Sequence, residues 1–203
     1  MINTIRNWIC FSPMLIKKIL GFKRTNDFSK KEYDTIAGQQ RIDYNFENKY
    51  AKQLTGYIQK YNPESILEVG AGECHKIGRI NIKCKKVATD ISIKRLLSGQ
   101  SNFPNIYIVQ ANASKLPFKD DEFDVVFSNH CLEQMPYEYK DAIKEMLRVA
   151  KKAVFLFEPS YEKGSLTQKM NMYAKDYVKG IPNFLFELQK DFIDSFNYIL
   201  HYL

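Results

Sequence analysis

The stretch Ile66-Leu67-Glu68-Val69-Gly70-Ala71-Gly72 decides how this 203-residue chain is expected to fold. Residues 66–69 form a short run rich in branched apolar side chains, which is typical of a buried strand. The two glycines after it permit a tight turn and let the backbone approach a ligand closely. Since ligands of open α/β sheets bind outside the carboxyl ends of the strands, this turn is the first candidate for a binding site.

Residue patterns around this turn alternate between strand and helix. Apolar side chains recur at helical spacing over residues 46–61 and 139–150, and the segments between strands are long enough for crossover helices. The alternation predicts an α/β fold with a doubly wound, mostly parallel sheet and helices on both faces. Residues 198–203 fit either a strand or the end of a helix, so the last strands stay open. Short runs rich in Val, Ile and Phe, typical of buried parallel strands, occur at residues 66–69, 87–89, 106–109, 125–127 and 154–157.

The chain divides into a basic arm at residues 1–45, the α/β domain at 46–160 and an aromatic-rich segment at 161–203. Most of the net charge of +7 lies in residues 1–31, which hold seven basic residues and one acidic residue. Because phosphate tracking needs basic groups spread over the binding face, we expect no nucleic-acid partner. The arm fits two interpretations: an amphipathic helix on a membrane surface, or a helix that docks as a lid over the substrate cleft.

Cysteine usage bounds the location of the protein. Cys10, Cys74, Cys84 and Cys131 are scattered without Cys-x-x-Cys spacing, which predicts neither a metal site nor a disulfide framework. This favours a reducing cytoplasmic location, and the basic arm adds peripheral membrane contact as a second expectation. No run approaches the roughly 20 apolar residues that a membrane-spanning helix needs.

The charges of the turn discriminate between two classes of nucleotide ligand. Asp90 ends the next strand and is well placed to bind a ribose diol. The third glycine of a dinucleotide fingerprint would fall at position 75, which is a histidine. Glu68 and Glu73 bracket the turn and would repel a pyrophosphate, whereas the ammonium and sulfonium of S-adenosylmethionine suit an acidic turn. The sequence therefore favours S-adenosylmethionine over NAD as the cofactor.

Residues 46–159 resemble the Rossmann-like S-adenosylmethionine-dependent methyltransferases of the broad family that includes ubiquinone and sterol methylating enzymes. The resemblance implies that these motifs hold the cofactor and that Asn112, which replaces the usual aspartate, accepts a hydrogen bond from the adenine amino group through its amide oxygen. Gln134 replaces the histidine of the family's Leu-Glu-His motif. The matching motifs are ILEVGAG at residues 66–72, DIS at 90–92, ASKLPF at 113–118, FDVV at 123–126 and LE at 132–133.

The cofactor site that the resemblance implies has three parts. Gly70, Ala71 and Gly72 pack on the methionine part. Asp90 binds the ribose hydroxyls and Ile91 packs on the adenine face. The residues assigned to the cofactor are, in full, Glu68, Gly70, Ala71, Gly72, Asp90, Ile91, Asn112, Ala113 and Asn129.

Two residues after the fourth and fifth strands are the candidate catalytic groups. Methyl transfer is a displacement at an already activated carbon, so the protein mainly aligns the acceptor and excludes water. For a hydroxyl acceptor, His130 is the first candidate base because an imidazole titrates near neutrality, and Glu158 is the second. Each also has a structural interpretation, as a hydrogen-bonding group of its loop or as a capping acid.

The residues after the fourth strand also bear on the acceptor. The family's amino-methylating nucleic-acid enzymes carry a Pro-Pro-aromatic motif there, whereas this chain has Ser128-Asn129-His130-Cys131. The sequence therefore predicts a methyltransferase for a small-molecule, glycan or lipid-linked acceptor, acting at a hydroxyl. Residues 161–203 are expected to be largely helical and to recognise the acceptor. The alternatives are a non-catalytic S-adenosylmethionine-binding module and an NAD-dependent oxidoreductase.

Overall fold

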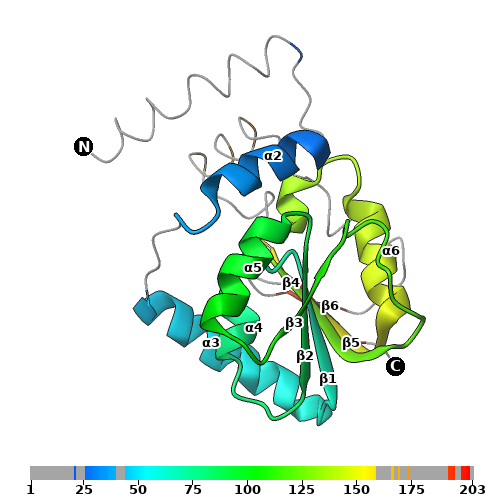
Figure 1. The fold of residues 1–203 in the computed structure, drawn as a ribbon. Coiled ribbons are helices and arrows are strands. Elements are labelled where there is room, and N and C mark those ends of the chain that lie inside the picture. Colours follow the sequence, from blue (N-terminus) through cyan, green and yellow to red (C-terminus); the bar gives the residue numbers. More distant parts are fainter. Residues whose placement is uncertain are drawn as a thin grey trace.

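A seven-stranded sheet forms the centre of the computed structural model, which describes residues 21, 26–39, 44–158, 166, 169, 173, 192–194 and 198–201 (Figure 1). The strand order is β3-β2-β1-β4-β5-β7-β6. The first five of these strands are parallel, and β7 pairs antiparallel with both β5 and β6. The strands are β1 Ser65–Val69, β2 Lys85–Asp90, β3 Tyr107–Gln110, β4 Phe123–Asn129, β5 Ala150–Phe157, β6 Phe192–Asp194 and β7 Tyr198–His201.

The predicted mostly parallel sheet is confirmed, and the two strands that the sequence left open are β6 and β7. Of the two interpretations of residues 198–203, the strand is right over Tyr198–His201. Both strands are short and pair antiparallel at the far edge of the sheet, unlike the parallel strands that the sequence predicted.

Helices cover both faces of the sheet, as the doubly wound arrangement requires. One face is covered by α3 Tyr44–Ile58, α4 His75–Arg79 and α5 Ile93–Asn102, and the other by α6 Tyr139–Val149 (Figure 1). Successive strand residues alternate between the two layers: Ile66 packs in the core under α3, α4 and α5, and Leu67 packs in the core under α6. Each fully buried side chain of this size contributes roughly 1.5–3 kcal/mol by leaving water. Two 3-10 turns, η1 Gln59–Tyr61 and η2 Leu132–Gln134, complete these elements.

Helix α2, Asn26–Ile36, crosses the end of the sheet at which the parallel strands finish (Figure 1). The Ser92 hydroxyl at the start of α5 donates a hydrogen bond to Asp34, and Gly38 donates its N–H to Glu73 over 3.0 Å. Residues 26–39 of the basic arm are therefore docked on the domain, while the amphipathic stretch around Trp8 lies outside the described residues. Within the described ranges, none of the helices has the length and apolar character needed to cross a bilayer.

Candidate functional site

A pocket opens at the carboxyl ends of β1, β2 and β4, where the strand order reverses. This is the position at which open α/β sheets bind ligands. Six residues predicted from the sequence line it: Gly70, Asp90, Ile91, Asn112, Ala113 and His130. The other lining residues are Ser29, Tyr33, Val69, Thr89, Arg95, Ala111, Cys131, Gln134 and Met135. Five predicted site residues do not line the pocket: Glu68, Ala71, Gly72, Asn129 and Glu158.

The turn after β1 requires its glycines. Gly70 has φ +73° and Gly72 has φ +53°, a left-handed conformation that other residues rarely adopt. A Cβ on Gly70 would lie 2.3 Å from Sγ of Cys131, and one on Gly72 would lie 2.6 Å from Nη2 of Arg95. The turn is therefore held tightly between the loop after β4 and the helix after β2.

Asp90 presents a fixed carboxylate to the pocket. Its Oδ2 accepts the N–H of Gly72 over 2.8 Å and its Oδ1 accepts the N–H of Ser92 over 2.9 Å. Burial raises the pKa of Asp90, which is 6% exposed, while these hydrogen bonds and the charge of Arg95 act in the opposite direction. Because each carboxylate oxygen has further acceptor capacity, Asp90 remains able to accept two hydroxyl groups of a ligand.

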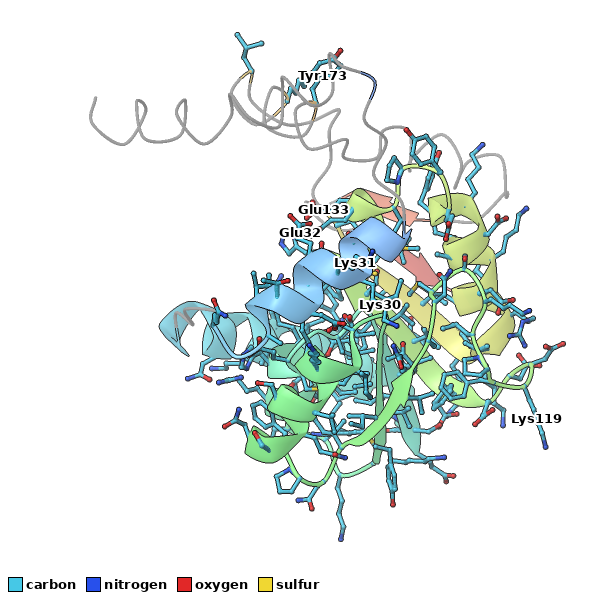
Figure 2. All side chains as sticks on the ribbon, turned by 45° about the horizontal axis from the view of Figure 1, so that its top comes forward. Lys30, Lys31, Glu32, Lys119, Glu133 and Tyr173 are labelled. Carbon is cyan, nitrogen blue, oxygen red and sulfur yellow. The ribbon has the colours of Figure 1, made fainter. Side chains whose placement is uncertain are left out.

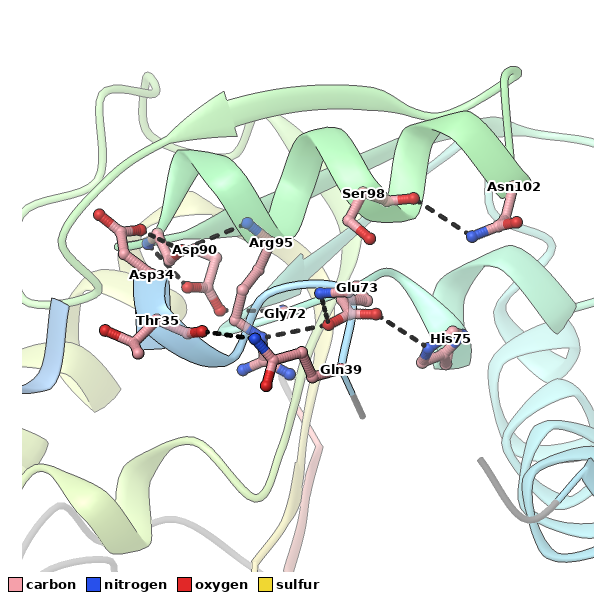
Figure 3. A network of polar contacts seen from close by, with 12 residues as sticks. Asp34, Thr35, Gln39, Gly72, Glu73, His75, Asp90, Arg95, Ser98 and Asn102 are labelled. Carbon is pink, nitrogen blue, oxygen red and sulfur yellow. Dashed lines mark hydrogen bonds and ion pairs between the residues drawn. The ribbon is translucent and has the colours of Figure 1, made fainter. Parts of the chain in front are cut away.

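The two glutamates of the turn do not face the pocket, contrary to the electrostatic argument from the sequence. Glu68 is buried beneath the turn, and its Oε2 accepts the N–H of Ile77 over 3.0 Å. Glu73 turns toward the docked arm: its Oε1 accepts from Gly38 and lies 3.9 Å from Nε of Arg95 (Figure 3). The repulsion of a pyrophosphate therefore does not arise from these carboxylates lining the site. Asp90 and Arg95 are the oppositely charged residues at its wall.

Sequence reasoning missed Arg95 and the residues of α2. The guanidinium of Arg95 lies over Gly72, and its Cζ is 5.4 Å from the centre of the Tyr33 ring. Figure 3 shows Arg95 between Asp90 and Glu73. Arg95 follows the second motif by three residues and could have been found by its place in the first turn of α5, whereas Tyr33 belongs to no motif.

Asn112 lies at the pocket wall with its amide already engaged. Its Oδ1 accepts from both the N–H and the hydroxyl of Ser114, over 2.9 and 3.0 Å, and its Nδ2 lies 3.4 Å from Oε2 of Glu138. The single proton of the Ser114 hydroxyl can instead go to Oε2 of Glu138, which lies at the same distance of 3.0 Å. The amide oxygen of Asn112 then has a lone pair for an adenine amino group.

Ala71 and Asn129 support the walls of the site. Ala71 donates its N–H to the carbonyl of Thr89 over 2.8 Å, which ties the turn to the end of β2. Asn129 ends β4, and its Oδ1 is buried without a hydrogen-bond partner in the described part of the chain. Tyr173, which belongs to the segment expected to recognise the acceptor, is 47% exposed and is not among the residues that line the pocket.

His130 reaches the pocket from the loop after β4. The residue has φ +54°, an uncommon conformation for a side chain other than glycine, and its N–H donates to the carbonyl of Phe157 over 3.1 Å. The imidazole is 52% exposed, and its Nδ1 lies 3.2 Å from Oε1 of Glu133. The loop thus places an ionisable residue at the pocket wall, with the Glu133 carboxylate next to Nδ1 of its ring.

Glu158 lies behind the pocket wall. Its Oε1 accepts from the Ser128 hydroxyl over 2.7 Å and from the N–H of Cys131 over 3.2 Å, and its Oε2 accepts the N–H of Glu133 over 3.3 Å. Burial first and the charge of Glu133 second raise the pKa of Glu158 to about 7. At 1% exposure, Glu158 binds the loop rather than facing an acceptor, as its structural interpretation predicted.

Comparison with known proteins identifies the domain that carries this site. Residues 67–157 match the family model described as a methyltransferase domain. The malonyl-[acyl-carrier protein] O-methyltransferase of Marinomonas sp. (strain MWYL1) is 26% identical over 149 residues, covering 70% of this chain and 52% of that protein. The ubiquinone/menaquinone biosynthesis C-methyltransferase of Vibrio campbellii is 34% identical over 95 residues, covering 47% of this chain and 36% of that protein.

A solved structure shares the fold over most of the chain. A candidate S-adenosylmethionine-dependent methyltransferase of Methanococcus maripaludis superposes with a TM-score of 0.58 at 15% identity, covering 89% of this chain and 94% of the other. Residues 67–157 thus match a methyltransferase domain, which agrees with the predicted kind of enzyme, and the shared architecture confirms the predicted Rossmann-like fold. The chain spans about half the length of the first curated relative and about a third of the second.

Proposed function

We propose that this protein transfers the methyl group of S-adenosylmethionine to a hydroxyl of a small-molecule, glycan or lipid-linked acceptor, with His130 as the base. The observation that carries the proposal is that Asp90, at the end of β2, and His130, after β4, line the same pocket. One is a fixed carboxylate suited to a ribose, and the other is a titratable ring suited to removing a proton.

The residues of the pocket fit the charges of this cofactor. Gly70 lines the pocket without a side chain of its own, and Asp90 offers acceptors for two ribose hydroxyls. Among the described lining residues, Arg95 is the permanently charged cation, and the methionine carboxylate is the anionic group of S-adenosylmethionine. Arg95 therefore binds that carboxylate. When bound, the cofactor supplies a methyl carbon made electrophilic by the sulfonium.

The nature of the base favours a hydroxyl acceptor. An alcohol is a weak nucleophile that gains from proton removal as it attacks, whereas a neutral amine already carries a free lone pair. His130 takes the proton from the acceptor oxygen at Nε2 while the new carbon–oxygen bond forms. The ring is half exposed at the pocket wall, so an acceptor can reach it from solvent.

The finer family branch and the location are also part of this proposal. The ordered motifs fit the branch of ubiquinone and sterol methylating enzymes, and the similarity to the Vibrio campbellii C-methyltransferase supports it. One of the named relatives is an O-methyltransferase and the other is a C-methyltransferase, so they do not themselves favour a hydroxyl as the acceptor group. We further propose a cytoplasmic protein whose basic residues before α2 contact anionic membranes, since apolar and basic side chains alternate there.

Label transfer from methyl-labelled S-adenosylmethionine to a panel of hydroxylated acceptors tests the reaction. We expect transfer by the wild type and a decrease of about 100-fold for His130→Gln with cofactor affinity retained, because general-base catalysis contributes about that factor. Glu122→Gln, a change at an exposed loop, is the control. Tight cofactor binding with no transfer to any acceptor would indicate a binding module instead. Calorimetry with NAD in parallel tests the oxidoreductase alternative.

Removal of residues 1–25 tests the membrane contact while leaving α2 intact. We expect the truncated protein to lose its binding to vesicles that contain anionic phospholipid and to retain its affinity for the cofactor. Unchanged vesicle binding would contradict the proposed contact.

A further inference from the structure

We infer that the two buried glutamates behind His130 have opposite roles: Glu133 is the charged positioning residue of the imidazole, and Glu158 is a protonated acid that holds the loop. The inference deepens the proposed function and rests on it for the catalytic consequence, because a positioned imidazole matters only if His130 is the base. The division of charge between the two glutamates can be tested without any methyl acceptor.

The first step is that the two carboxyl groups are buried together. Glu133 is 4% exposed and Glu158 is 1% exposed, and the backbone N–H of Glu133 donates to Glu158. Two carboxylates that share a buried site cannot both ionise cheaply, so one of them keeps its proton. Both lie at the end of the sheet that α2 crosses; Figure 2 labels Glu133 there and Lys119 at the opposite end.

The second step is that the partners of the two glutamates differ. Glu158 accepts from a hydroxyl and two backbone N–H groups, which favour its charged form, but none of them is a cation and burial outweighs them. Glu133 has Oε1 at 3.2 Å from Nδ1 of His130, and its Oε2 is buried without a hydrogen-bond partner in the described residues. A hydrogen bond from the Nδ1–H of the imidazole therefore stabilises charge on Glu133. The pKa of Glu158, raised to about 7 by burial and by Glu133, agrees with the proton residing there near neutral pH.

Glu133 also determines the tautomer and raises the pKa of the His130 imidazole. A carboxylate at Nδ1 fixes the tautomer that carries its proton on Nδ1, which leaves Nε2 free to accept a proton from the pocket side. Burial lowers the pKa of His130, but the hydrogen bond and charge of Glu133 outweigh it and raise the pKa. Lys76 of α4 acts weakly in the opposite direction. Burial raises the pKa of the neighbouring Cys131 thiol well above its usual value, so that thiol adds no charge.

Matched glutamine substitutions separate the two roles. Glu133→Gln keeps the size of the side chain and removes the charge at Nδ1, so we expect the titration midpoint of His130 to fall and the pH profile of methyl transfer to move with it. Glu133→Asp restores a carboxylate and should recover part of the shift. In Glu158→Gln a neutral amide replaces a neutral acid, so the His130 midpoint should stay near that of the wild type below pH 7. Glu122→Gln is the control for a remote glutamate.

The measurement is the titration of imidazole and carboxyl groups by NMR in the full chain with S-adenosylhomocysteine bound. The chain has three histidines, and the His130 signal is the one lost in His130→Gln. We expect one glutamate carboxyl signal of the wild type to titrate near neutral pH and to vanish in Glu158→Gln. This wild-type measurement decides the question even if Glu133→Gln fails to fold.

The inference is overturned if Glu133→Gln leaves the His130 midpoint unchanged, if Glu158→Gln lowers it as much, or if the near-neutral carboxyl signal belongs to Glu133. Expected titrations without methyl transfer to any acceptor would contradict the proposed function and leave the division of charge standing. Methyl transfer together with a His130 midpoint that does not change in Glu133→Gln would support the proposed function and contradict the division of charge.

Discussion

The two halves of the pocket differ in the groups that form them: backbone and a fixed carboxylate in one half, ionisable side chains in the other. At the ends of β1 and β2, the wall consists of a tight glycine turn and a carboxylate whose two oxygens accept backbone N–H groups. After β4 and β5, it consists of ionisable side chains, with His130 in front and the buried Glu133 and Glu158 behind. The first half recognises a constant ligand by rigid backbone geometry. The second half depends on protonation and suits the chemical step.

The rigidity of the glycine half gives the largest expected effect. Gly70→Ala places a methyl group 2.3 Å from the Cys131 sulfur in a left-handed conformation, so we expect the free energy of unfolding to fall by about 3 kcal/mol and cofactor binding to drop below detection. Chemical denaturation and calorimetry measure both quantities. Gly56→Ala in α3 is the matched control, because a Cβ there meets nothing within 4 Å and should stabilise the helix by about 0.5–1 kcal/mol. Equal stability of the two variants would show that the turn is not rigid.

Glu158, in the half of the pocket after β4 and β5, should make the free energy of unfolding depend on pH. The folded-state pKa of Glu158 lies above its unfolded value, so its contribution is present below the unfolded pKa and is lost as pH rises to about 7. Glu158→Gln removes this dependence. The difference in the free energy of unfolding between wild type and variant should therefore shrink by roughly 2–3 kcal/mol as pH rises from 4.5 to 7. Urea denaturation at each pH measures this difference. A constant difference across this range contradicts the assignment.

Asp90 tests the carboxylate of the rigid half. Asp90→Ala should weaken binding of S-adenosylhomocysteine by about 1–3 kcal/mol, which is the typical cost of losing hydrogen bonds to a charged acceptor. Calorimetry measures the change, with Asp120→Ala on an exposed loop as the control. If Asp90→Ala binds as tightly as the control, the ribose assignment is wrong.

Substitution of Arg95 has the smallest expected effect on cofactor binding, and two ligands that differ in the methionine carboxylate test it. Arg95→Gln should weaken binding of S-adenosylhomocysteine by about 1 kcal/mol, since the methionine carboxylate loses a charged partner. Binding of 5′-methylthioadenosine, which lacks that carboxylate, should be unchanged. If both ligands weaken equally, Arg95 supports the turn without binding the carboxylate.

The sequence predicted the rigid half better than the titrating half, for a physical reason. Gly70, Gly72 and Asp90 are tied to local backbone geometry at strand ends, which short motifs record. The directions of Glu68 and Glu73 depend on packing, and the argument from charge alone placed them wrongly. Strand alternation was a usable signal, because Glu68 shares a face with Ile66 and both point into the layer under α3 and α4.

Other parts of the site could not be read from local patterns. Tyr33 and Arg95 are 62 positions apart and meet only because α2 docks on α5. Glu133 matched a motif by position, but its contact with His130 depends on the left-handed bend at that histidine. Likewise, β6 and β7 are defined by pairing with β5 rather than by strong patterns of their own.

The hydrogen bond from Gly38 to Glu73 links the segment after α2 directly to the glycine turn. Binding equilibria that share such a link are reciprocal: any factor by which docking of α2 strengthens cofactor affinity is the same factor by which the cofactor strengthens docking of α2. Ligand binding and docking of the arm are then coupled equilibria. A partner that engages the arm from outside would thereby change the affinity for the cofactor.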